Sequence, residues 1–146
     1  METQPELTIV IPVYNEGENI LQSLREIQRH VAVPMTVGIV YDFEEDTTLA
    51  ALKQLPAGSS LKIRTVRNAY GRGVLNAIKT GLETADTELI IVTMADLSDP
   101  PEVMNEMIRV ARETGAAIVC ASRYMRGGQQ IGGPKLKGFL SRTAGM

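Results

Sequence analysis

The sequence is poor in several residue types that mark particular classes of protein. Its 146 residues include one cysteine, one histidine and no tryptophan, and aromatic residues make up 4% of the chain. A single cysteine cannot form an internal disulfide, so we expect a reducing, cytoplasmic location. So few aromatic side chains argue against nucleic acid as a partner, since a platform for single strands needs them. The single histidine argues against a Ser-His-Asp arrangement or a Cys/His metal site.

Long apolar runs are also missing. The first ten residues, METQPELTIV, carry no basic leader, and no apolar stretch approaches the roughly 18 residues that span a bilayer. We therefore expect neither a secretory leader nor a membrane span within these residues. Hydrophobic residues nevertheless make up 44% of the chain and charged residues 22%, which is typical of a compact domain with its own core.

Apolar patterns of two kinds alternate along the chain. Continuous or alternating β-branched runs predict strands at residues 7–13, 35–41, 61–66, 88–94 and 117–121. Apolar residues at helical spacing predict helices at residues 18–31, 47–55, 73–85 and 100–113. This alternation predicts a three-layer α/β/α domain with a mostly parallel sheet. Within it, we expect Cys120 in the core of the last strand and His30 on the solvent side of the first helix.

Polar side chains follow the predicted strands at the point where each strand ends. Pro12 marks the end of the first strand because it cannot donate to a sheet ladder, and Tyr14 and Glu16 follow it. Asp42 and Asp96 come directly after two other strands. Because ligands of open α/β sheets bind beyond the carboxyl ends of the strands, this convergence predicts a nucleotide or sugar site.

Asp96 is a candidate metal ligand, since a carboxylate beyond a fully apolar strand is costly unless it is solvated, paired or bound to an ion. Oxygen ligands at such a position suit Mg²⁺ or Mn²⁺ shared with substrate phosphates. The alternative is that Asp96 only hydrogen-bonds the next turn. Asp42 is a candidate acceptor for the imino N–H of a base, and the alternative there is a solvated acid in the run DFEED.

Two glycine-containing segments have weaker signals. The loop NAYGRG, residues 68–73, precedes a predicted helix, so its backbone N–H groups could face an anion; the alternative is a tight turn, because the third glycine of a dinucleotide fingerprint is missing. Residues 123–146 hold five basic residues, no acidic ones and six of the 13 glycines. That segment is either a phosphate-facing element or a solvated loop.

Five motifs in order resemble family-2 glycosyltransferases, especially the dolichol- and undecaprenyl-phosphate sugar transferases. They are IPVYNEGENI, VYDFEEDTT, NAYGRGVLNAIKTGLETA, VTMADLSDPPEVM and CASRYMRGG. The resemblance covers the chain from Thr8 to Gly128. It implies a GT-A fold, a UDP- or GDP-linked hexose donor, a divalent cation and a polyprenyl-phosphate acceptor. It also implies a nucleotide-sugar-binding domain over residues 1–122, with residues 123–146 beginning an acceptor-binding part.

The resemblance assigns roles to individual residues. Pro12, Tyr14 and Glu16 match the segment that lines the base and ribose, and Asp42 and Asp46 match two acids of the nucleotide-binding pattern. Asp96 matches the last acid of the Asp-x-Asp metal motif, and Arg123 matches a basic residue near the donor's phosphates; these two are the expected catalytic residues. The general base and an amphipathic, membrane-facing portion are expected beyond residue 146, so we expect these 146 residues alone to be inactive.

Two departures from the family pattern bear on this expectation. Tyr41 stands where the second motif usually has its first acid, and Met94 replaces the first acid of Asp-x-Asp. The working hypothesis is a hexosyltransferase, and the alternative is a decayed nucleotide-binding or regulatory module of the same fold. A nucleotidyltransferase with a similar sheet is disfavoured, because Asn15-Glu16-Gly17 stands where its Gly-rich, Lys-containing loop would be.

Overall fold

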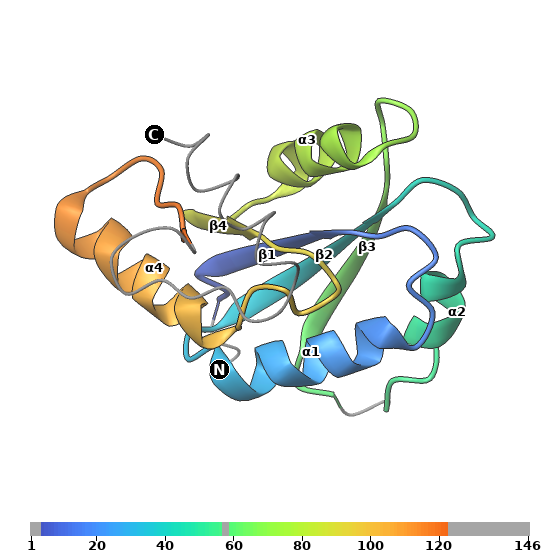
Figure 1. Ribbon diagram of the computed structural model, residues 1–146, viewed down its shortest axis with the longest axis horizontal. Helices are drawn as coiled ribbons and strands as arrows, with labels where there is room; N and C mark the ends of the chain where they lie inside the picture. Colours follow the sequence, from blue (N-terminus) through green and yellow to red (C-terminus); the bar gives the residue numbers. More distant parts are fainter. Residues whose placement is uncertain (1–3, 57–58, 123–146) are drawn as a thin grey trace, which may run out of the picture. The chain divides into compact units, whose positions relative to one another are not determined.

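The computed structural model describes residues 4–56 and 59–122 and contains a parallel sheet with helices on both faces (Figure 1). The elements follow in the order β1 (Leu7–Pro12), α1 (Asn19–His30), β2 (Met35–Tyr41), α2 (Thr47–Leu52), β3 (Lys62–Arg67), α3 (Val74–Thr84), β4 (Leu89–Val92) and α4 (Glu102–Thr114). The chain divides into two compact units, Met1–Arg109 and Val110–Met146, and the whole sheet belongs to the first. The predicted α/β/α fold with a parallel sheet is confirmed.

The sheet has the strand order β3-β2-β1-β4, and every pair of neighbours is parallel. Leu7 lies opposite Met35 on one side and opposite Leu89 on the other, so β1 is an interior strand with a neighbour at each edge. Every residue of β1 is buried. A strand flanked on both edges and covered on both faces needs a continuous apolar run rather than an alternating one, which explains the sequence LTIVIP.

One face of the sheet carries the larger core. Alternate strand residues point to this face because side chains of a strand change sides at each step, and they pack against α1 and the first turns of α4. Helix α1 presents its apolar side at three- and four-residue spacing. The main contributors are Ile9, Ile11, Ile20, Leu24, Ile27, Val37, Ile39, Ile91, Met104 and Ile108.

Helix α3 covers the opposite face (Figure 1). A small cluster of Val10, Val40 and Ala77 forms the contact there. Gly81 of α3 lies so close to Val10 that an added Cβ would overlap the Val10 side chain. The chain must cross from β3, at one edge of the sheet, to β4 at the other, and this glycine allows the crossing helix to approach β1 closely.

Helix ends differ from the sequence prediction by more than one residue in two places. Helix α4 begins at Glu102 rather than at Pro100, because a residue that precedes a proline is disfavoured in the helical region and Pro100 precedes Pro101. Helix α2 ends at Leu52, three residues before the predicted end. Among the described residues, no helix is long and apolar enough to cross a membrane.

The prediction for residues 117–121 is wrong. These residues form no strand, and Cys120 is exposed rather than part of the core. The apolar run AIVCA has the composition of a buried strand, but a strand forms only where a neighbouring edge supplies hydrogen bonds. The four-stranded sheet contains no pairing with this run.

The prediction that His30 faces solvent holds only in part. Its ring lies between two carboxylates, with Nδ1 3.1 Å from Glu102 and Nε2 3.3 Å from Glu26, and it is only partly exposed. The side chain of Asn105 bonds the backbone on either side of this point, donating to the His30 carbonyl and accepting from the Ala32 N–H. The end of α1 is therefore partly covered by the start of α4, a long-range contact that helical periodicity does not reveal.

Replacing Gly81 with alanine is expected to destabilise the fold. The new methyl group would overlap the fully buried Val10 side chain, and overpacking of this kind costs about 1–3 kcal/mol, of which the better helix propensity of alanine offsets up to about 1. Urea unfolding measures the difference. Gly38→Ala in β2 is the control, because a Cβ added there would lie an ordinary 3.9 Å from its nearest neighbour, the Ile9 carbonyl oxygen. Equal stability of the two variants would contradict the close approach of α3.

Candidate functional site

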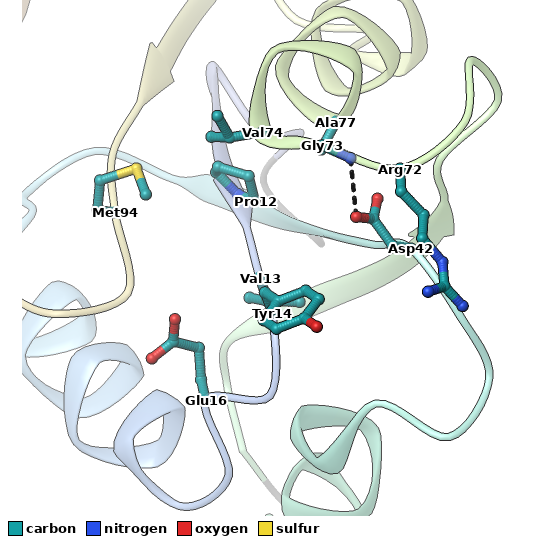
Figure 2. Close-up of a pocket in the computed structure, with 10 residues that line it drawn as sticks. All are labelled: Pro12, Val13, Tyr14, Glu16, Asp42, Arg72, Gly73, Val74, Ala77 and Met94. Atoms are coloured by element: carbon teal, nitrogen blue, oxygen red, sulfur yellow. Dashed lines mark hydrogen bonds between the residues drawn. The ribbon is translucent and has the colours of Figure 1, made fainter.

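A pocket of about 330 Å³ lies at the carboxyl ends of the strands (Figure 2). Its walls come from the segment that follows β1, from the ends of β2 and β4, and from the loop and first turn of α3. The lining residues are Pro12, Val13, Tyr14, Glu16, Asp42, Arg72, Gly73, Val74, Ala77 and Met94. Strand order reverses beside this place, since the chain moves outward from β1 to β3 and then returns to β4. Open α/β sheets bind ligands at such a switch point.

Most of the predicted nucleotide-binding residues lie together in this pocket. Pro12, Tyr14, Glu16 and Asp42 all line it, although they come from the ends of two different strands and the loops that follow them. Asp46 is not among the lining residues and is 2% exposed. Its Oδ1 caps α2 by accepting the Thr48 N–H at 2.8 Å. Its Oδ2 accepts the Asn15 N–H at 3.1 Å. The structure thus gives Asp46 a bracing role, and its contact with a nucleotide stays a prediction.

The loop between β1 and α1 is held in an unusual backbone conformation. Asn15 has a φ of 53° and Gly17 a φ of 55°, a region that Asn and Gly adopt more readily than other residues. The Asn15 side chain accepts the Thr47 N–H at 3.2 Å, and the Glu16 N–H donates to Thr48 Oγ1 at 3.1 Å. These bonds to the start of α2 fix the direction in which Tyr14 and Glu16 leave the loop.

Asp42 connects the end of β2 with the start of α3. Its Oδ2 accepts the Gly73 N–H at 2.9 Å, and its Oδ1 accepts the Asn68 side-chain amide at 2.8 Å. The Gly73 N–H, which the sequence suggested for an anion, is therefore occupied by a carboxylate of the protein. Each carboxylate oxygen offers two lone pairs, so both oxygens of Asp42 can still accept from a ligand.

A group of two aromatic rings and one guanidinium borders the pocket. The rings of Tyr14 and Phe43 meet edge to face with centroids 5.6 Å apart, and the Arg72 guanidinium carbon lies 5.0 Å from the centroid of Phe43. Tyr14 is 64% exposed, so its ring is available to a ligand. Sequence reasoning missed Arg72 because NAYGRG was interpreted through its glycines; the signal was a basic residue just before a helix that follows a strand.

Asp96 lies on the loop that follows β4, two residues beyond the pocket-lining Met94. Its Oδ1 accepts the Ser98 N–H at 2.9 Å. Hydrogen bonds from the backbone and side chain of Ser98 lower the pKa of the Asp96 carboxyl below its ordinary value, which keeps it ionised near neutral pH. The next residue, Leu97, has a φ of 55°, and the carbonyl of Ala95 accepts a hydrogen bond from the buried hydroxyl of Ser23. The loop is thus held in a strained conformation.

One predicted site residue, Arg123, lies outside the described residues. Within residues 4–56 and 59–122, no group of three or more His, Cys, Asp or Glu side chains gathers as a metal cluster. Burial and the nearby carboxylates of Asp96 and Asp46 raise the pKa of Glu16 above its ordinary value. Acidic side chains from separate loops therefore share one electrostatic environment at this edge of the sheet.

Comparison with known proteins identifies the family of this site. The sequence matches Glycosyl transferase family 2 over residues 8–143. It is 28% identical over 139 residues to a dolichol-phosphate mannosyltransferase of Pyrococcus furiosus, an alignment that covers 94% of this chain and 39% of that protein. The chain therefore spans well under half the length of this relative.

Solved structures show the same fold. A mannosyltransferase from Pyrobaculum calidifontis, in complex with GDP-Man and Mn²⁺, superposes with a TM-score of 0.63 at 24% identity, covering 75% of this chain and 33% of that one. The S. aureus protein TarS, in complex with UDP-GlcNAc, superposes with a TM-score of 0.58 at 17% identity, covering 75% of this chain and 32% of that one. These likenesses establish a GT-A glycosyltransferase fold.

Replacing Glu16 with glutamine is expected to stabilise the fold near neutral pH. The unfolded chain titrates Glu16 near its ordinary pKa of 4.5 and the folded chain titrates it higher. Between these two values the folded state binds more protons, so the raised pKa makes stability fall as pH rises through that window and stay lower above it. Glu16→Gln removes this loss, so its free energy of unfolding should exceed that of the wild type at about pH 7 and not at about pH 4.

Urea unfolding at the two pH values measures this difference. Glu45→Gln, an exposed position outside the pocket-lining set, is the matched control and should show the same difference from wild type at both. A stabilisation by Glu16→Gln that does not change with pH would contradict the electrostatic explanation.

Proposed function

Because this chain belongs to glycosyl transferase family 2, we propose that its pocket binds the nucleotide part of a nucleotide-sugar donor for transfer of a hexose to an acceptor. The observation that carries the proposal is that Tyr14, Asp42 and Arg72, from three separate segments, line one pocket at the carboxyl ends of the sheet. The GDP-Man and UDP-GlcNAc complexes of proteins with the same fold support a GDP- or UDP-linked donor.

The geometry suits recognition of a base and its phosphates. Tyr14 offers an exposed aromatic ring beside the buried Pro12, and flat apolar surface of this kind packs well against a base. The oxygens of Asp42 accept an imino N–H, which guanine and uracil both possess. Arg72 supplies a guanidinium that remains charged and can bind phosphate oxygens in a bidentate manner. Asp46 would support nucleotide binding by bracing the loop that carries Tyr14 and Glu16.

The carboxylate of Asp96, beyond the end of β4, fits a divalent cation that is shared with the donor. Asp96 would hold the ion through its ionised carboxylate, whereas the Met94 thioether is a poor ligand for Mg²⁺ or Mn²⁺. Magnesium sites commonly use one or two carboxylates together with substrate phosphates, so the donor's diphosphate completes the set. When bound, such an ion neutralises charge on a departing diphosphate. The Mn²⁺ in the Pyrobaculum calidifontis complex supports this use.

The acceptor is proposed to be a polyprenyl phosphate. The support is the Pyrococcus furiosus relative, which is a dolichol-phosphate mannosyltransferase. An acceptor phosphate is already anionic, so its attack on the sugar carbon needs little help from a base. Arg123 is proposed to act on the donor's phosphates. Because the chain spans 39% of that relative, acceptor binding, a general base, contact with a membrane surface and a cytoplasmic location are proposals for the whole protein.

The alternative is a nucleotide-binding module that no longer transfers sugar. Met94 favours it, because this residue lines the pocket where the family pattern has an acid. Tyr41 favours it as well, since its hydroxyl is used locally and donates to Glu44. Transfer or hydrolysis of the donor by a chain extended to the length of its relatives would exclude this alternative, whereas nucleotide binding without turnover would support it.

A panel of UDP, GDP and CDP, each with and without Mn²⁺, tests the proposed function. We expect GDP or UDP to raise the thermal unfolding temperature more than CDP, and more with Mn²⁺ than without, because the ion neutralises repulsion between the diphosphate and the carboxylates. Calorimetry then gives the dissociation constant of the best nucleotide. If no nucleotide binds at millimolar concentration, the proposed function is wrong.

Within the same experiment, Asp96→Ala is expected to abolish the Mn²⁺-dependent part of the affinity. Asp99→Ala, an exposed acid three residues further along, is the matched control and should behave as the wild type. A wild-type response to Mn²⁺ in Asp96→Ala would remove Asp96 from the cation site while leaving nucleotide binding as a separate result.

Replacing Met94 with aspartate is expected to strengthen the dependence on Mn²⁺. The new carboxylate stands two residues before Asp96 and adds a hard oxygen ligand where a thioether lines the pocket. We expect the affinity for GDP or UDP in the presence of Mn²⁺ to rise about tenfold, equivalent to about 1.4 kcal/mol. Met94→Asn provides the control for size and polarity without charge. An identical response of both variants to Mn²⁺ would show that position 94 does not face the ion.

A further inference from the structure

Thr80 is a buried hydroxyl in the middle of α3, outside the set of residues that line the pocket. It is 2% exposed, and both functions of its hydroxyl are used. The oxygen accepts the Ala69 N–H at 3.1 Å, and the hydroxyl donates to the side-chain oxygen of Asn68, also at 3.1 Å. A residue of the helix interior thus holds two consecutive residues of the loop that leads to the pocket.

These bonds decide which way the amide of Asn68 faces. Its Oδ1 accepts from the Thr80 hydroxyl and from the Tyr70 N–H at 3.1 Å. Its Nδ2 therefore points the other way and donates to Asp42 Oδ1 at 2.8 Å and to the Gly71 carbonyl at 2.7 Å. In the flipped amide an oxygen would face the Asp42 carboxylate, and an acceptor against an acceptor is repulsive.

The amide of Asn68 in turn helps to orient Asp42. With Oδ1 held by Asn68, the second oxygen of the carboxylate is directed at the Gly73 N–H, 2.9 Å away. Gly73 has a φ of 124°, a conformation that favours glycine, and it follows directly on Arg72. The bond from Asp42 to Gly73 therefore fixes the backbone that presents the Arg72 guanidinium.

We propose that Thr80 is a positioning residue for the nucleotide site and acts through Asn68 on Asp42 and on the loop that carries Arg72. The inference rests on the proposed function, because the affinity that Thr80 would control is the affinity for a nucleoside diphosphate. Thr80 itself touches no ligand. Hydrogen bonds in a chain of this kind support one another, so loss of the first one weakens the orientation of the carboxylate at the far end.

The test compares Thr80→Val, which keeps the shape and removes the hydroxyl, with Thr80→Ser, which keeps the hydroxyl. We expect Thr80→Val to weaken binding of GDP or UDP about fivefold to tenfold by calorimetry and Thr80→Ser to stay within about twofold of wild type. Hydrogen exchange of the Gly73 amide, followed by NMR, gives a second readout that needs no ligand. This amide should exchange faster in Thr80→Val, while the amides of β1 keep their protection relative to global unfolding.

A control variant separates positioning from loss of stability. Thr84→Val removes a hydroxyl from the same helix, one that donates to the Thr80 carbonyl at 2.9 Å and to no pocket loop. If Thr84→Val weakens nucleotide binding as much as Thr80→Val does, or if Thr80→Val leaves binding and Gly73 exchange unchanged, the proposal is overturned. If the wild type binds no nucleotide, the proposed function fails, and exchange at Gly73 alone then decides whether Thr80 positions the loop.

Discussion

The site depends on the crossing of α3 from one edge of the sheet to the other. Strands β1, β2 and β3 lie side by side in chain order, and the next strand, β4, pairs with the other edge of β1. The chain must therefore return across β2 and β1, and it does so on the face opposite α1 (Figure 1). Close contact between Gly81 and Val10 makes this return compact. The first turn of α3 consequently lies above the carboxyl ends of β1 and β2.

This arrangement brings a helix start and a carboxylate together. The first N–H groups of a helix have no partner within the helix, and a negative charge near them is favourable. Asp42 meets both requirements by accepting the N–H of Gly73. The same bond joins the end of β2 to the start of α3. It pairs a helix N–H group that has no partner within the helix, and both of its residues line the pocket. The guanidinium of the neighbouring Arg72 lies over the ring of Phe43. Arg72 therefore places a positive charge among the residues that line the pocket (Figure 2).

Much of the fold and part of the site could be predicted from the sequence. The continuous apolar run of β1 and the helical spacing in α1 are local signals, and strand ends in a parallel sheet fall on one edge, which brings Tyr14, Glu16 and Asp42 together. The failures depend on contacts between distant segments. The run AIVCA forms no strand although its composition favours one, and His30 is flanked by carboxylates of α1 and α4. Arg72 enters the pocket only because of the crossing of α3, which periodicity cannot show.

The charges at the pocket favour a cation that accompanies the proposed ligand. Among the described residues that line the pocket, Glu16 and Asp42 are acidic and Arg72 is the one basic side chain. Asp96 adds its field from the next loop, strongly enough to contribute to the raised pKa of Glu16. A diphosphate brought to this rim would add further negative charge, and among the described lining residues only Arg72 opposes it. Met94, where the family pattern has an acid, leaves one protein ligand and one negative charge fewer at this rim, but the carboxylates of Glu16, Asp42 and Asp96 still repel a diphosphate. The electrostatics therefore favour a cation that arrives with the nucleotide, held mainly by phosphate oxygens, over one bound beforehand by the protein.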